Sequence, residues 1–364
     1  MSGDRREARL DRLRAALGER ELDALIVSHL PNVRYLTGFT GTSALVVVGE
    51  RELVLYSDFR YREQAAEEVG SLARVEIVER ELWAKAIRTL SEMRRVVAVG
   101  YEAETLSAAA ERRLAENGNG IEARPTTDLV EALRSQKDAE EIASIAEAAR
   151  LACEALQAAL ETVRVGQREL DVAATLEHEL RVRGSEWHPF PTIVASGPRS
   201  ALPHAGTTER IVESGDWLLL DFGAQVDGYC ADVTRTVVVG RAADERQRSM
   251  YELVREAQGR AVQHVRAGMT GRDADALARS IIEARGFGDQ FGHSLGHGLG
   301  LEVHEGPSLG RANEKEIPAD AVVTVEPGIY LPGWGGVRIE DDVHVTADGA
   351  TLLSDGDTEL RELV

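Results

Sequence analysis

The sequence predicts a two-domain protein, with a small α/β domain over residues 1–130 and a larger α+β domain over residues 131–364. A chain of 364 residues is too long for one ordinary hydrophobic core. Strand and helix signals alternate in the first part, whereas longer helices and groups of strands follow in the second. The turn-forming run PTTD at residues 125–128 marks the change between them.

The first part alternates short apolar strands with helices. Leu10, Leu13 and Leu17 share one face of an opening helix. Strands are expected at residues 24–28, 53–57, 75–78 and 96–101, and helices at residues 63–69 and 105–117. Pro31 and Asn32 are expected to begin a polar turn. A small sheet with flanking helices follows from this order.

The second part begins with long helical patterns. Residues 138–163 are rich in Ala, Glu and Leu, and Gly166 ends the pattern. A second helix is expected at residues 170–183, and two more helices fill residues 244–285. Strands dominate residues 192–239 and return from residue 322.

Composition excludes several classes of partner. The net charge of -20 argues against nucleic acid, whose binding depends on clustered Lys and Arg. No apolar run approaches the roughly 18 residues that cross a bilayer, and the first residues lack the apolar core of a signal peptide. We therefore expect a cytoplasmic protein with no membrane partner. Cys153 and Cys230 lie in an expected helix and an expected strand, and both are expected to be buried thiols.

The first chemical signal is a hairpin that carries two acids. The apolar run at residues 217–220 has the pattern of a buried strand and ends on Asp221. Asp227-Gly228 is a strong turn signal. That turn makes Asp221 and Asp232 diagonal neighbours on one face, roughly 7 to 8 Å apart at the backbone. Two buried carboxylates need compensating cations, so the hairpin predicts a metal site.

The second signal is a glycine-rich segment that carries three histidines. His293, His297 and His304 lie among five glycines in residues 291–307. Glycine lets the backbone approach a site closely, and imidazole is a common ligand of divalent metals. A lone histidine is more often structural, but three within this segment favour a site.

The third signal repeats the first. An apolar run at residues 322–325 ends on Glu326, and the returning strand carries Arg338 and Glu340 on one face. Either acid alone could equally begin a turn. The two acid-bearing strand pairs and the histidine segment together offer Asp221, Asp232, His297, Glu326 and Glu340. Four anions call for about four positive charges, so two divalent cations are expected.

Two metals about 3.5 to 4 Å apart can hold a bridging water, lower its pKa and stabilise an oxyanion. The expected chemistry is hydrolysis of a polarised carbonyl. His293 or His304 could bind the substrate or the oxyanion, and Arg338 could anchor a carboxylate with its bidentate fork.

Six segments resemble a known family. DFGAQVDGYCADVTRT, HSLGHGLGLEVHEGP, TVEPGIY and GVRIEDD resemble signature segments of the pita-bread metallopeptidases, in the Xaa-Pro branch of aminopeptidase P and prolidase. LPNVRYLTGFTG and YSDFRY resemble the creatinase-like amino-terminal domain of that branch. The resemblance implies a creatinase/prolidase-like α/β domain over residues 1–130 and a pita-bread catalytic domain over residues 131–364.

The resemblance also implies roles for single residues. Two metals, most commonly Mn²⁺ with Zn²⁺ or Co²⁺ as alternatives, would be held by Asp221, Asp232, His297, Glu326 and Glu340. Asp232 and Glu340 would bridge the ions, and Glu326 would be the general base. Substrate-binding positions are matched by His204, His293, His304 and Arg338. Tyr330 and Arg338 match positions linked to proton transfer and to the active-site network.

The implied function is hydrolysis of the bond between an amino-terminal residue and proline, in dipeptides or short peptides, through a metal-bridging hydroxide. Proline lacks an amide hydrogen and has a fixed φ, so this bond suits a dedicated pocket. A homodimer is expected. Two alternatives are a methionine aminopeptidase-like peptidase, which the amino-terminal domain argues against, and a non-catalytic binding module, which the intact ligand set argues against.

The preferred substrate length stays open in the sequence. Arg34 is a candidate for recognising the carboxylate after proline, on charge alone. His188 and Arg199 are expected near the entrance of the pocket.

Overall fold

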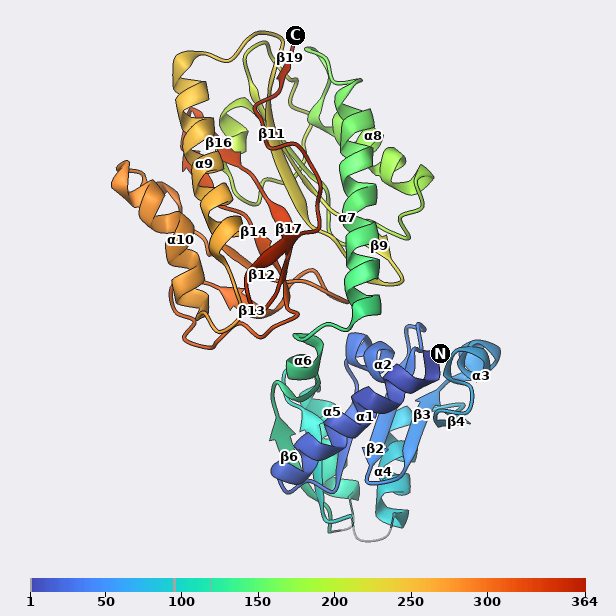
Figure 1. Ribbon diagram of the computed structural model, residues 1–364. Helices are drawn as coiled ribbons and strands as arrows, with labels where there is room; N and C mark the ends of the chain where they lie inside the picture. The colour runs from blue at the N-terminus through green and yellow to red at the C-terminus, as the bar shows by residue number, and fades with distance from the viewer. Residues whose placement is uncertain (1, 94–95, 119) are drawn as a thin grey trace. The chain divides into compact units, whose positions relative to one another are not determined.

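The computed structural model describes residues 2–93, 96–118 and 120–364 (Figure 1). The chain divides into two compact units, residues 1–134 and residues 135–364. The predicted boundary after residue 130 falls inside helix α6 (Leu129–Arg134), at the end of the first unit.

The first unit is an α/β domain on one mixed six-stranded sheet, in the order β4-β3-β2-β1-β5-β6. Its strands are β1 (Ala24–Val27), β2 (Ala44–Gly49), β3 (Leu53–Ser57), β4 (Arg74–Ile77), β5 (Ala98–Glu102) and β6 (Glu122–Thr126). Its helices include α1 (Ser2–Glu19), α3 (Arg62–Val69), α4 (Leu82–Glu92) and α5 (Ala108–Asn117). Every residue of β1, β2 and β3 is buried, as central strands covered on both faces require. The four strands expected from the sequence are confirmed.

The turn predicted at Pro31 is wrong. Residues Leu30–Thr37 form helix α2, with Pro31 in its first turn. Proline is tolerated there because the N–H groups of a first turn have no partner inside the helix. Asn32 is buried, and its side-chain amide donates to Glu102 at 2.7 Å. A buried polar network thus replaces the turn that the residue types suggested. Arg34 lies half-buried on the same helix.

The second unit places its strands between two pairs of helices (Figure 1). The helices are α7 (Ala139–Leu160), α8 (Glu169–Val182), α9 (Glu245–His264) and α10 (Gly271–Ala284). Its two larger sheets have the orders β19-β11-β8-β7 and β13-β12-β14-β17-β18. The first contains β7 (Ile193–Ser196), β8 (Trp217–Phe222), β11 (Val233–Val239) and β19 (Glu362–Leu363). The second contains β12 (Gly296–Gly298), β13 (Glu305–Leu309), β14 (Val322–Val325), β17 (Asp341–Val345) and β18 (Ala350–Leu352).

Each helix pair packs on its own sheet. Apolar side chains of α7 and α8 share one core with β8 and β11, while those of α9 and α10 share another with β14 and β17. The two halves therefore follow the same order, in which a helix pair precedes an acid-bearing strand pair. Asp221 lies on β8, while Asp232, Glu326 and Glu340 lie directly beside the ends of β11, β14 and β17.

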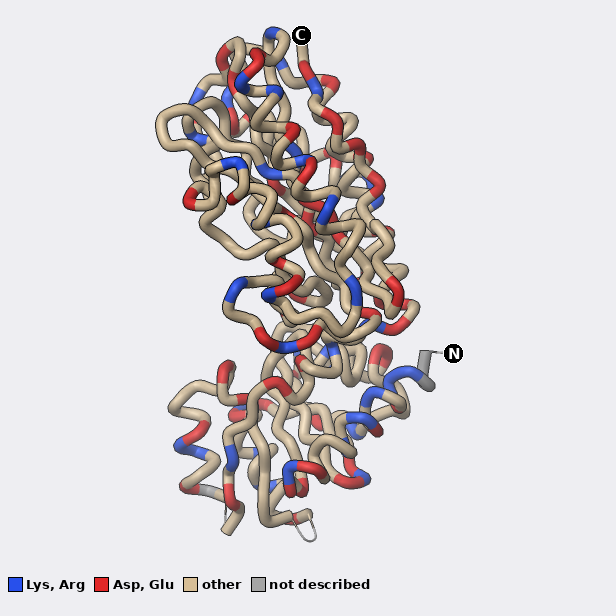
Figure 2. The backbone as a smooth tube through the Cα atoms, turned by 60° about the vertical axis from the view of Figure 1, so that its left-hand side comes forward, with Lys and Arg blue, Asp and Glu red and all other residues tan. Residues whose placement is uncertain are grey.

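Charges are distributed as the sequence suggests. Figure 2 shows basic and acidic residues interleaved along both units. Such interleaving is typical of solvated helix faces, and the absence of a nucleic-acid partner stays a prediction. Among the described helices, none has the length and apolar composition needed to span a membrane.

The two cysteines are buried free thiols, as predicted. Cys153 lies on α7 and Cys230 on the short strand β10 (Tyr229–Cys230). Burial raises the pKa of each thiol to about 12. Neither is therefore poised as a nucleophile.

Candidate active site

The first hairpin has the predicted turn and register. Asp227 and Gly228 have φ values of 49° and 73°, the left-handed pair that a type I′ turn requires. Val226 pairs with Tyr229, and the ladder continues until Asp221 lies opposite Thr234. Both acids of the hairpin thereby line one cavity.

The second acid pair reaches the first through one backbone bridge. Glu326 follows β14, and Glu340 precedes β17, the antiparallel partner of β14. The Glu340 amide donates to Thr234 O at 3.1 Å, which joins this strand to β11 of the other sheet. The two sheets thus bring together acids from distant parts of the chain, such as Asp232 and Glu340.

These residues surround a cavity of about 550 Å³. Its wall contains every predicted site residue except Tyr330, namely His204, Asp221, Asp232, His293, His297, His304, Glu326, Arg338 and Glu340. The Tyr330 ring is buried on β15 (Gly328–Leu331), and its hydroxyl contacts His293. His204 and His304 are exposed at the cavity.

The orientation of His297 indicates a cation site. Its Nδ1 lies 3.0 Å from Gly298 O, which can only accept, so Nδ1 carries the proton. The bare Nε2 then faces Glu326 Oε1 at 3.5 Å and Asp232 Oδ2 at 3.8 Å. Three lone-pair donors around one point repel each other unless a cation lies between them. An imidazole that donates its other N–H to a backbone carbonyl is the usual arrangement of a metal-binding histidine.

A second group of donor atoms also indicates a cation site beside His297. Asp232, His297 and Glu340 each present one ligand atom within 4.8 Å of the others. Asp232 Oδ1 is buried, and among the described residues it has no hydrogen-bond partner. An orphaned buried carboxylate oxygen is costly unless a cation satisfies it. The residues present therefore fit a divalent metal.

The pKa values of the carboxyl groups report the same crowding. Burial and the neighbouring Glu340 raise the pKa values of Asp232 and Glu326 well above their usual range. Burial and Asp221 raise the pKa of Glu340 to about 7. Burial also raises the pKa of Asp221, although Arg338 opposes this shift. Without cations, protons would offset part of the repulsion among these acids.

A directed hydrogen-bond chain supports His293. Arg338 Nη1 donates to Tyr330 Oη at 2.8 Å. His293 Nδ1 donates to Ser294 O at 2.8 Å, so its Nε2 accepts from the Tyr330 hydroxyl at 2.9 Å. Burial lowers the pKa of His293 to about 4 and raises that of Tyr330 to about 12, so both groups are neutral.

Comparison with known proteins identifies the family. Residues 143–347 match the model of metallopeptidase family M24, and residues 9–136 match the Creatinase/Prolidase N-terminal domain. The chain belongs to metallopeptidase family M24. The predicted family, its pita-bread catalytic domain and its creatinase-like first domain are confirmed, and so is the enzyme class, a peptidase.

Relatives of this M24 peptidase match along nearly all of its length. It is 39% identical to the Xaa-Pro dipeptidase of Pyrococcus furiosus, over 97% of this chain and 99% of the relative. It superposes on the Xaa-Pro dipeptidase from Bacillus anthracis with a TM-score of 0.95 and 39% identity, over 98% of this chain and 100% of the other. For the X-Pro aminopeptidase from Thermotoga maritima the TM-score is 0.90 at 35% identity, over 97% and 99% of the two chains.

Several supporting residues of this M24 site had weak or misleading sequence signals. Thr234 accepts from Arg338 Nε at 3.0 Å and donates to Glu340 at 2.5 Å. Asp342 was missed, although it accepts from the Asp232 amide at 3.1 Å. Its signal was its position two residues after Glu340, because strand alternation places it on the same face as Arg338 and Glu340.

Two expected entrance residues serve other contacts. Arg199 pairs with the fully buried Glu169 at 3.1 Å, and His188 stacks on Trp187 at 4.5 Å between ring centroids. Neither Arg199 nor His188 is among the described residues that line the cavity. Their chain neighbours Phe190 and Pro203 do line it.

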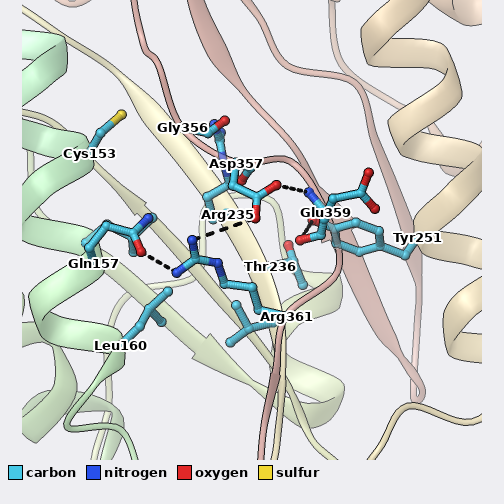
Figure 3. Close-up of a pocket in the computed structure, with 12 residues that line it drawn as sticks. Cys153, Gln157, Leu160, Arg235, Thr236, Tyr251, Gly356, Asp357, Glu359 and Arg361 are labelled. Atoms are coloured by element: carbon cyan, nitrogen blue, oxygen red, sulfur yellow. Dashed lines mark hydrogen bonds and ion pairs between the residues drawn. The ribbon is translucent and has the colours of Figure 1, made fainter.

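A separate small hollow lies beside β11 (Figure 3). Its volume of about 10 Å³ is too small for a substrate. Arg235 lies against it and donates to Gly356 O at 3.0 Å and Asp357 O at 3.1 Å, while Nη1 donates to Glu340 O at 2.6 Å. This hollow therefore belongs to the structural support beneath Glu340.

Proposed function

We propose that this protein is a dinuclear metal-dependent peptidase that hydrolyses the Xaa-Pro bond at the amino terminus of dipeptides or short peptides. The observation that carries the proposal is the convergence of four carboxylates and one imidazole on a single cavity. The substrate class is supported by the relatives named Xaa-Pro dipeptidase and X-Pro aminopeptidase.

Two divalent ions would be held by Asp221, Asp232, His297, Glu326 and Glu340. When bound, the ions would balance the carboxylate charges, lower the pKa of a coordinated water to give the bridging hydroxide, and polarise the scissile carbonyl. Asp232 and Glu340 belong to the tight group of donors around His297, which supports bridging roles for both. Asp221 lies outside that group, as a ligand to one ion only would.

Residues of the protein would supply the general base and the groups that orient the substrate. Glu326 Oε2 lies 3.9 Å from His293 Nδ1, so the carboxylate faces both the donor group and the histidines. Its raised pKa suits a general base that accepts a proton and returns it to the leaving nitrogen of proline. His293 and His304 would orient the substrate, and His304 would stabilise the oxyanion because the one N–H of His293 donates to Ser294 O, while His204 also lines the cavity.

Arg338 and Tyr330 would keep this machinery in place. The guanidinium pairs with Asp221 and donates to the Tyr330 hydroxyl, which donates in turn to His293. Through these hydrogen bonds, the buried Arg338 guanidinium fixes the position of the His293 imidazole. We therefore assign to Arg338 the role of orienting this hydrogen-bond network. The side of the guanidinium that faces the cavity would also contact the substrate.

The cavity also offers an apolar surface for the pyrrolidine ring. Its wall includes Phe190, Pro191, Ile193, Pro203 and Val303. A second hollow, of about 900 Å³, shares His293, Ser294 and Ser308 with the cavity. This neighbouring space supports acceptance of peptides longer than a dipeptide.

The test is hydrolysis by purified protein loaded with Mn²⁺. We expect proline release from Ala-Pro and alanine release from Ala-Pro-Ala, with Met-Ala and Ala-Ala at least about tenfold slower in kcat/KM. Asp232→Asn is the inactive control. Preference for Met-Ala would favour a methionine aminopeptidase, whereas no metal binding and no hydrolysis of any peptide would favour a binding module.

The same assay shows which substrate length the enzyme accepts. Equal turnover of Ala-Pro and Ala-Pro-Ala would support use of the second hollow. Turnover of Ala-Pro alone would make the protein a strict dipeptidase. Mn²⁺ as the native metal, the homodimer and the cytoplasmic location stay predictions, to be tested by metal analysis of protein purified without chelator, analytical ultracentrifugation and cell fractionation.

A further inference from the structure

Helix α10 carries an ion pair on the face that enters the core. Asp275 is 1% exposed and Arg279 is 6% exposed. They form two parallel bonds, from Nε to Oδ2 at 2.5 Å and from Nη2 to Oδ1 at 2.8 Å. A buried ion pair is seldom more stabilising than apolar side chains of the same volume, because both charges lose water. The pair therefore needs a role beyond stability.

Three further hydrogen bonds join this pair to the segment at residues 291–295. Arg279 donates to Phe291 O at 2.7 Å and to His293 O at 2.6 Å. On the other side of the histidine, the Leu295 amide donates to Asp275 Oδ1 at 3.0 Å. The segment lies in irregular structure just before β12. Its backbone is thus held on both sides of His293 by side chains of one helix.

The Arg279 guanidinium also contacts the Phe291 ring, which in turn contacts His293. Arg279 Cζ lies 4.0 Å from the centroid of the Phe291 ring. That ring meets the His293 imidazole edge to face, with 5.1 Å between centroids and 89° between planes. At the end of the segment, Leu295 O accepts from the Glu326 amide at 2.8 Å. The pair is therefore coupled to the main chain and ring of His293 and to the main chain of Glu326.

We propose that Asp275 and Arg279 are positioning residues, which hold the His293 imidazole against Tyr330 and beside Glu326 for the reaction. The inference rests on the proposed function. Neither residue is among the described residues that line the main cavity, and only Arg279 lines the second hollow, so on a dipeptide substrate both act through His293. Arginine is required because its planar fork reaches one carboxylate and two carbonyl groups at once, whereas a lysine ammonium is a single point charge.

The test combines single and double substitutions in the Mn²⁺-loaded enzyme, with the dipeptide Ala-Pro as substrate so that the second hollow beside Arg279 is not used. Arg279→Lys should lower kcat about tenfold or more with less than about a threefold change in KM, because a small displacement of a reacting group is costly. Metal content should not change. In a His293→Ala background, Arg279→Lys should lower kcat little further, because no imidazole remains to be positioned. Arg272→Lys, on the exposed face of the same helix, is the matched control and should keep full activity.

A second readout does not depend on activity. In metal-free protein, the ring proton resonance of His293, assigned by its loss in His293→Ala, should move in Arg279→Lys and stay in place in Arg272→Lys. If the wild type hydrolyses no peptide, the proposed function fails while this measurement still tests the positioning role. Asp275→Asn is the second variant, expected to move the same resonance.

Three results would overturn the inference. One is an unchanged His293 resonance in both variants. Another is a full multiplicative loss of kcat when Arg279→Lys is added to His293→Ala. The third is loss of metal, or failure of both variants to fold, which would make the pair a structural element.

Discussion

Arg338 and Asp221 form an ion pair between strands of the two acid-bearing hairpins, with Arg338 on β16 (Gly335–Arg338) and Asp221 on β8. Both side chains are buried in the second unit. The guanidinium also donates to Thr234 and to Tyr330. One cation thereby connects a proposed metal ligand, the strand that supports another ligand, and the hydrogen-bond chain to His293.

Removing this cation should destabilise the fold. Arg338→Met leaves the Asp221 carboxylate buried without its partner, so we expect the free energy of unfolding of metal-free protein to fall by about 3–5 kcal/mol. Urea denaturation measures the change. Arg272→Met, which breaks an exposed pair with Glu314, should cost at most about 1 kcal/mol. Similar losses in the two variants would contradict a central role for the buried pair.

Metal counts should separate the two acids of the first hairpin. Asp232→Asn is expected to remove both ions, since Asp232 belongs to the tight donor group. Asp221→Asn is expected to leave one ion. Elemental analysis after dialysis against limiting Mn²⁺ gives the ratio of metal to protein. The reverse pattern would show that the bridging assignment is wrong.

Stabilisation by metal should increase with pH. The folded-state pKa of Glu340 is raised to about 7, so in metal-free protein this group lowers stability as pH rises from its ordinary value near 4.5 toward 7. Asp232 and Glu326 act in the same direction. Metal binds the ionised groups and displaces their protons. The rise in Tm on adding Mn²⁺ should therefore be larger at pH 8 than at pH 5.5, and an equal or smaller rise at pH 8 would contradict this.

The two thiols should resist modification in the folded protein. With pKa values of about 12 for Cys153 and Cys230, only ~1 thiol in 10,000 is ionised at pH 8, and neither is exposed. A chromogenic disulfide reagent should report no reaction in native protein and two thiols in guanidinium chloride. Rapid labelling of either cysteine in native protein would show that its surroundings open.

Much of the site could be predicted because its determinants are local. The Asp227-Gly228 turn sets the register of one hairpin, and strand alternation then places Asp221 and Asp232 on one face. The run ending on Glu326 is equally local. The helix at Pro31 was mispredicted because proline and asparagine favour turns as well as first helical turns, and only burial of Asn32 decides between them.

By itself, the sequence determined most of the order of helices and strands, the acids on each hairpin and the family motifs, since turns and periodicity act over a few residues. The tertiary structure alone decided which groups meet. The bond between Thr234 and Glu340 spans 106 positions and arises where two sheets join, which no local pattern encodes. Asp275 and Arg279, spaced like an exposed helical pair, are buried because α10 turns that face toward the core beside His293.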